Sequence, residues 1–60
     1  SINMDVVRKS IVANQVIKKG DVLTDNNITT KRPGTGISPM EWDKVIGTLA
    51  AKNYMIDDLI

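Results

Sequence analysis

The chain has 60 residues, so it forms at most one small domain. It has eight basic and seven acidic side chains. Because it contains neither cysteine nor histidine, it offers no disulfide and no His or Cys metal ligand. Its basic residues are dispersed in pairs beside a single Trp and a single Tyr, which disfavours nucleic-acid binding. No apolar run approaches the ~20 residues of a transmembrane helix, and the N-terminus lacks the apolar core of a signal peptide, so a soluble, cytoplasmic protein is expected.

The first half of the chain predicts two short strands joined through turns. Residues 10–13, SIVA, form a β-branched apolar run that is typical of a strand. Gly20 supplies the backbone freedom for a turn after it, and Thr24 is expected to cap a single helical turn over residues 24–28. Residues 29–31, TTK, should resume an extended conformation, because two β-branched threonines favour it.

The strongest local signature is that of a short helix. Ser38 is predicted as its N-cap, Pro39 as its first residue and Glu41 as the partner that completes a capping box. Gly47 stands where a C-terminal glycine belongs, which leaves about two turns. Apolar residues at helical spacing should bury one face of this helix, and Trp42 on that face is expected in the core, with an interface role as the alternative. The members of the face are Trp42, Val45 and Ile46.

The C-terminal segment repeats the rhythm of the segment around Gly20. When Ala50 is set on Ala13, Asp57 falls where Gly20 stood. The other aligned pairs are Leu49 with Val12, Tyr54 with Ile17, Asp58 with Asp21, Leu59 with Val22 and Ile60 with Leu23. Such a repeat predicts a pseudo-twofold packing in which each copy covers the apolar face of the other. The expected fold class is a small, mostly β domain with one or two short helical turns.

The sequence KRPGTG, which begins at Lys31, is the best candidate for a functional site. Pro33 fixes φ, and Gly34 and Gly36 permit tight backbone geometry, so Arg32 should be presented at a fixed place. A binding arginine needs this kind of preorganisation. The alternative is that the two cations are a solvated pair at a strand end, as most exposed charges are.

Two stretches, SIVANQVIKKGDVLT and KRPGTGIS, carry a resemblance to a known family. Together they resemble the antifreeze-like, or SAF, domain found at the C-terminus of bacterial sialic acid synthases, and the similarity extends over residues 8–60. Its most specific part is the K-R-P-G-x-G motif. The resemblance implies a β-clip fold and a single domain, residues 1–60, from the C-terminus of a larger synthase.

In that family the chemistry belongs to a (β/α)₈ barrel, which condenses phosphoenolpyruvate with N-acetylmannosamine and uses a divalent metal, usually Mn²⁺, held by barrel histidines. The resemblance implies that the SAF domain caps the barrel of the partner subunit in a domain-swapped homodimer. Arg32 would then hydrogen-bond the acetamido group of the sugar, with Lys31, Pro33, Gly34 and Gly36 positioning the loop. The domain itself would hold no metal and no catalytic residue, and its sequence shows no nucleophile with an adjacent base.

The alternative function is a freestanding binding module for ice or for a carbohydrate. SIVANQVI is also similar to the opening of type III fish antifreeze proteins, which bind ice through a flat, weakly polar face. Here the corresponding turn carries Lys18, Lys19 and Asp21, whose strongly hydrated charges disfavour such a face. One departure from the synthase family is Asp57, which replaces the glycine expected in the second turn, although Asp tolerates the left-handed backbone region better than most residues.

Overall fold

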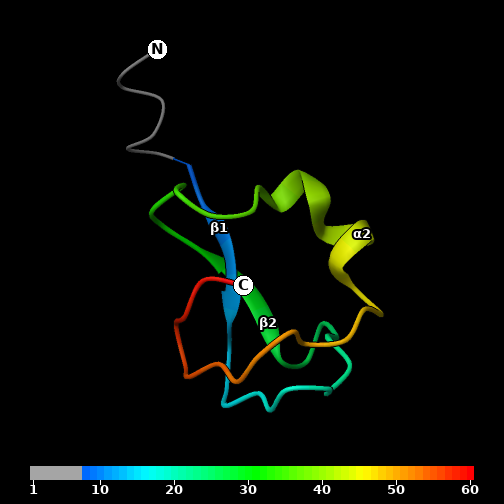
Figure 1. Ribbon diagram of the computed structural model, residues 1–60. Helices are drawn as coiled ribbons and strands as arrows, with labels where there is room; N and C mark the ends of the chain where they lie inside the picture. Colours follow the sequence, from blue (N-terminus) through cyan, green and yellow to red (C-terminus); the bar gives the residue numbers. More distant parts are fainter. Residues whose placement is uncertain (1–7) are drawn as a thin grey trace.

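The chain folds around one pair of antiparallel strands, which Figure 1 shows at the centre of long turns. The computed structural model describes residues 8–60. Its elements in chain order are β1 (Ser10–Ala13), β2 (Ile28–Lys31), the 3₁₀ turn η1 (Pro39–Glu41) and α2 (Trp42–Val45). The two predicted strands and the predicted helix are therefore confirmed. No helix within the described segment has the length and apolar character needed to cross a bilayer.

Strand β1 is the central strand of the domain, and all four of its residues are buried. On one side it pairs with β2, so that Ser10 lies opposite Lys31. On the other side Ile11 N–H donates to the carbonyl of Ile37 at 2.9 Å, and Ile60 N–H donates to the carbonyl of Ile11 at 3.1 Å. Because neighbours bond both of its edges, β1 exposes no backbone edge to solvent at this position.

The predicted repeat forms a near-twofold arrangement about Ile17 and Tyr54. These two residues exchange two backbone hydrogen bonds of 2.9 and 2.8 Å. The bridges on either side pair Val12 with Leu59 and Val22 with Leu49, which are the partners that a twofold axis through the central pair requires. Each copy therefore makes equivalent backbone pairings with the other, as the alignment of the two segments predicted.

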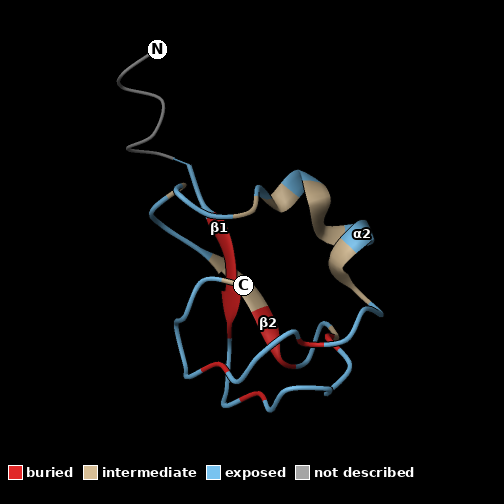
Figure 2. Cartoon of the chain, in the orientation of Figure 1, coloured by how far each residue is buried: buried red, intermediate tan, exposed pale blue. Residues whose placement is uncertain are grey.

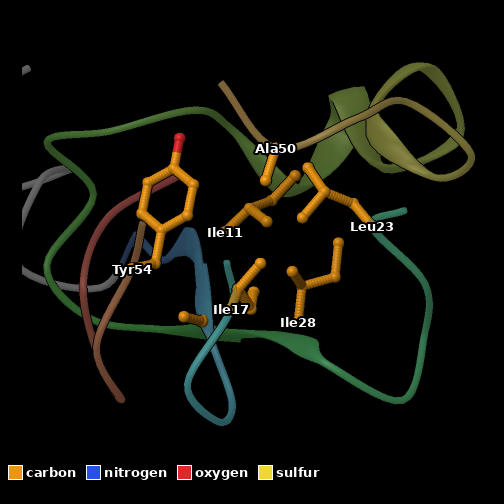
Figure 3. Close-up of a cluster of buried hydrophobic side chains, with 7 residues drawn as sticks. Ile11, Ile17, Leu23, Ile28, Ala50 and Tyr54 are labelled. Carbon is orange, nitrogen blue, oxygen red and sulfur yellow. The ribbon is translucent and has the colours of Figure 1, made fainter. Parts of the chain in front are cut away.

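Both copies contribute to one hydrophobic core (Figure 3). Figure 2 shows the buried positions on β1 and at short stretches of the surrounding turns, with most of the turn surface exposed. Fully burying an Ile or Leu side chain contributes roughly 1.5–3 kcal/mol, so these few residues supply most of the hydrophobic stabilisation of so small a domain. The members of the core are Ile11, Ala13, Ile17, Leu23, Ile28, Ala50 and Tyr54.

The helix starts as predicted but differs in two details. The Ser38 hydroxyl accepts from the amide of Met40 at 3.1 Å, which confirms the N-cap. The capping box is only half formed, because the first turn is 3₁₀ and the Glu41 carboxylate lies 3.3 Å from the ammonium of Lys44 instead of reaching back to the cap. Gly47, with φ of 89°, ends the segment.

The apolar face of α2 packs against the core but is only half-buried. The prediction of a fully buried face is therefore too strong. The helix is so short that only one side of its apolar face contacts the core, and the rest of that face is exposed to solvent. Trp42 belongs to this face and packs on the core, so its core assignment holds in part.

Candidate functional site

The KRPGTG loop, residues 31–36, connects the end of β2 to the start of η1 and is fixed to β1 at both ends. Lys31 is the last residue of β2 and pairs with Ser10. Immediately after the loop, the carbonyl of Ile37 accepts from the amide of Ile11 at 2.9 Å. The loop therefore leaves and rejoins the domain at the first two residues of one strand, which restricts where its central residues lie.

A buried serine side chain makes two further bonds to the loop. The hydroxyl of Ser10 donates to the carbonyl of Pro33 at 2.6 Å and accepts from the amide of Gly36 at 2.8 Å. Ser10 is completely buried. The sequence analysis places Ser10 only as the first residue of a strand and does not identify this role. A polar residue at the start of a fully buried strand was the available signal, because buried hydroxyls are normally hydrogen-bonded.

The two loop glycines make room for neighbouring segments. A Cβ atom at Gly34 would overlap the Cβ of Arg8, and one at Gly36 would lie 3.1 Å from Leu59 Cδ2 and 3.3 Å from Ser10 Cβ. Neither glycine has a positive φ, so the need is for space and not for an unusual backbone conformation. The sequence predicted tight geometry here, but its cause is close packing against the chain's own β1 and C-terminal segment.

The two adjacent cations of the motif have different surroundings. The Lys31 ammonium lies 2.6 Å from a carboxylate oxygen of Asp57, and both side chains are about half exposed. Arg32 is exposed, and within residues 8–60 its guanidinium has neither a hydrogen bond nor an ion pair. The solvated-pair alternative thus fails for Lys31, whose charge is used within the domain. The exposed Arg32, which has no partner among residues 8–60, agrees with that alternative as well as with a ligand-binding role.

An open groove of about 460 Å³ lies beside the loop. Gly34 and Gly36 line it together with the cations Arg8 and Lys9, which the sequence analysis did not single out. Arg32 does not line this groove. The predicted site residues are therefore contiguous in the loop, but only Gly34 and Gly36 among them line this groove. The remaining lining residues are Ser38, Pro39 and Met40.

The carboxylates of this domain do not suit the divalent metal that the resemblance implies. No three acidic side chains within the described residues come close enough together to hold a metal ion. The sequence contains no His or Cys that might replace them. No step is therefore assigned to a metal on this chain.

Comparison with known proteins adds a family and two relatives. Residues 8–60 match the sequence model of the SAF domain. The chain is 50% identical over 58 residues to the N,N'-diacetyllegionaminic acid synthase of Campylobacter jejuni, and this alignment covers 97% of the chain and 17% of the relative. A pseudaminic acid synthase of the same species is 29% identical over 55 residues, which cover 92% of the chain and 16% of the relative. The chain thus spans about a sixth of the length of these synthases.

Proposed function

The chain belongs to the SAF domain family, and from this premise we propose that it is the substrate-capping and dimerisation domain of a cytoplasmic sialic-acid-type synthase. In this proposal the parent enzyme condenses phosphoenolpyruvate with an N-acetylated sugar such as N-acetylmannosamine. Arg32 enters the barrel mouth of the partner subunit in a domain-swapped homodimer and donates a hydrogen bond to the acetamido group. The observation that carries the proposal is the exposed Arg32, which lacks a partner among residues 8–60 and stands on a loop fixed at both ends.

The small share of the relatives that the chain covers supports a noncatalytic role. About five sixths of each synthase lies outside the matched segment. The described residues hold no three-carboxylate group for a metal. We therefore assign the condensation, and the divalent metal that serves it, to the barrel and not to this chain. In this proposal the domain contributes the hydrogen-bond donor of Arg32 and a surface that docks on the barrel.

Exposed apolar side chains support the docking part of the proposal. Met55 and Ile56 are 64% and 57% exposed and directly precede Asp57, which binds Lys31 beside the proposed arginine. Apolar side chains grouped on a surface mark interaction sites in soluble domains. If the barrel of the partner subunit covered Met55 and Ile56, the neighbouring KRPGTG loop would lie at the rim of that barrel. The large apolar residues that are exposed within residues 8–60 are Val16, Val22, Met40, Leu49, Met55, Ile56 and Leu59.

The chemistry of the donor suits the proposed acceptor. An acetamido carbonyl is neutral, and a hydrogen bond from a charged donor to it contributes about 1.5–3 kcal/mol once water is excluded, or roughly one to two factors of ten. The guanidinium of Arg32 is planar, permanently charged and long, so it reaches a sugar beyond the domain surface. The 50% identity to a synthase whose product is diacetylated favours an N-acetylated sugar as the substrate class.

The test replaces Arg32 in the intact synthase and compares two sugars. With Arg32→Ala we expect the ratio of kcat/KM for N-acetylmannosamine to that for mannose to fall about 10- to 100-fold, because only the first sugar carries the acetamido acceptor. Arg32→Lys should give an intermediate ratio, since it keeps the charge without the planar fork. Lys19→Ala, which removes an exposed cation from the distant first turn, is the control and should leave the ratio unchanged. Equal discrimination by the Arg32→Ala variant and the unsubstituted enzyme would exclude the acetamido role.

A further inference from the structure

Resting on the proposed role of Arg32, we propose that Ser10 is a positioning residue, whose buried hydroxyl hydrogen-bonds both ends of the Pro33–Gly36 bend and thereby sets how well the enzyme discriminates N-acetylated sugars. The residue does not touch the sugar in this proposal. It acts through the backbone of the loop, from the first position of β1.

The two bonds use the hydroxyl as both donor and acceptor. Ser10 Oγ donates to the carbonyl of Pro33 at 2.6 Å and accepts from the amide of Gly36 at 2.8 Å. A hydroxyl has one donor and two acceptor lone pairs, so one small side chain meets both needs. Alanine offers neither group. The site is also closely packed, since Ser10 is completely buried, so a larger polar side chain would have to displace its neighbours.

Both sequence neighbours of Arg32 are tied to Ser10. On one side Lys31 pairs with Ser10 across the sheet, and on the other the carbonyl of Pro33 accepts the Ser10 hydroxyl. Ser10 therefore fixes the backbone on both sides of Arg32, while the Arg32 side chain is exposed and makes no hydrogen bond or ion pair among residues 8–60. A misplacement of about 1 Å at a substrate-positioning group is enough to lower activity strongly.

Because Ser10 is buried, the structure of the Pro33–Gly36 bend depends on its two hydrogen bonds. Serine is mostly an exposed residue in proteins, yet here it is completely buried. No buried side-chain nitrogen or oxygen in the described part of the chain lacks a hydrogen-bond partner. Removal of the hydroxyl leaves the Pro33 carbonyl and the Gly36 amide without this partner, so the bend should open toward water to satisfy them.

The chain offers a matched control in the turn before β2. Asn27 is also buried, its side-chain oxygen accepts from the amide of Thr24 at 2.8 Å, and its side-chain nitrogen donates to the carbonyl of Val22 at 3.0 Å. Asn27→Ala therefore removes one donated and one accepted bond from a turn, as Ser10→Ala does. That turn contains no part of the KRPGTG loop, so a purely structural loss should leave the loop unaffected.

The experiment compares Ser10→Ala, Asn27→Ala and Arg32→Ala in the intact synthase. The first readout is hydrogen exchange of the backbone amides of residues 34–36, and the second is the kcat/KM ratio for N-acetylmannosamine over mannose. With Ser10→Ala we expect exchange to accelerate roughly tenfold and the sugar ratio to fall about three- to thirtyfold, mainly through a higher KM for the N-acetylated sugar. Asn27→Ala should change neither readout.

A second variant keeps the test decisive if loss of the hydroxyl weakens folding generally. Ser10→Cys retains a weak donor and acceptor at similar size, so its sugar ratio should lie between those of serine and alanine. The positioning role is overturned if Arg32→Ala lowers the sugar ratio while Ser10→Ala does not, or if Ser10→Cys discriminates worse than Ser10→Ala. Failure of the proposed function looks different, because Arg32→Ala would then leave the ratio unchanged while Ser10→Ala still accelerates exchange in the loop.

Discussion

The turns at residues 18–21 and 55–58 occupy equivalent places in the two copies of the repeat. In the first, a side-chain oxygen of Asp21 accepts from the amide of Lys18 at 3.0 Å, and in the second a side-chain oxygen of Asp58 accepts from the amide of Met55 at 2.8 Å. The third residue of each turn has a positive φ, 93° at Gly20 and 73° at Asp57. The backbone is thus the same, and the two turns differ at the residue that adopts the left-handed conformation.

That difference follows the surroundings of each turn. The first turn bonds a neighbouring segment of the second copy, where the amide of Lys19 donates to Asn53 at 2.8 Å. The second lies beside the KRPGTG loop, because Asp57 pairs with Lys31, and Leu59, which follows the turn, lies close to Gly36. Glycine is the least costly residue for this backbone, and Asp is the kind of residue that tolerates it. The second copy therefore accepts a small backbone cost at the position from which a carboxylate reaches the loop.

The largest effect on the free energy of unfolding is expected within the central pair of the two copies, Ile17 and Tyr54. Ile17→Ala should lower the free energy of unfolding by about 2–5 kcal/mol, because it leaves a cavity in the centre of the core. Tyr54→Phe should change it by less than about 0.5 kcal/mol, since the hydroxyl points away from the buried cluster (Figure 3). Urea denaturation of the 60-residue chain measures both. A loss below about 1 kcal/mol with Ile17→Ala would show that Ile17 does not lie at the centre of the core.

Local signals in the sequence predicted the backbone well. The Ser38 cap, the strand at residues 10–13 and the turn at Gly20 each depend on residues within a few positions of one another. The repeat could be predicted because it compares one local pattern with another. The family motif likewise indicated the loop before its geometry was known.

The contacts that support the candidate site could not be predicted in the same way. The hydrogen bonds from Ser10 to the loop span 23 and 26 residues, and the ion pair between Lys31 and Asp57 spans 26. Such pairs depend on which strands become neighbours, and no local pattern encodes that. The half-formed capping box at Glu41 has a local cause instead, because the first turn is 3₁₀ and the carboxylate pairs with Lys44, three residues further along the chain.

Exchanging the residues at the third position of the two turns tests our comparison of these turns, and we expect effects of intermediate size on stability. Gly20→Asp should destabilise the domain by about 1 kcal/mol, and the cost is due to the backbone alone, because no atom lies within 4 Å of a Cβ at this position. Asp57→Gly should stay within about 0.5 kcal/mol of the unsubstituted chain, since relief of the left-handed backbone offsets loss of the ion pair. Thermal and urea unfolding measure both. A clear loss with Asp57→Gly and none with Gly20→Asp would reverse our account of the two turns.

The smallest expected effect isolates the ion pair that only the second turn makes. Lys31→Met should cost about 0.2–1 kcal/mol in ~0.01 M salt, because both charged groups are about half exposed and water weakens their attraction. The cost should approach zero in ~1 M salt, where the Debye length falls to about 3 Å. The adjacent Arg32→Ala is the control, since Arg32 has no charged partner among residues 8–60, and its stability should not depend on salt in this way. If the loss in Lys31→Met persisted at high salt, the aliphatic part of the side chain and not its charge would be what joins the second turn to the loop.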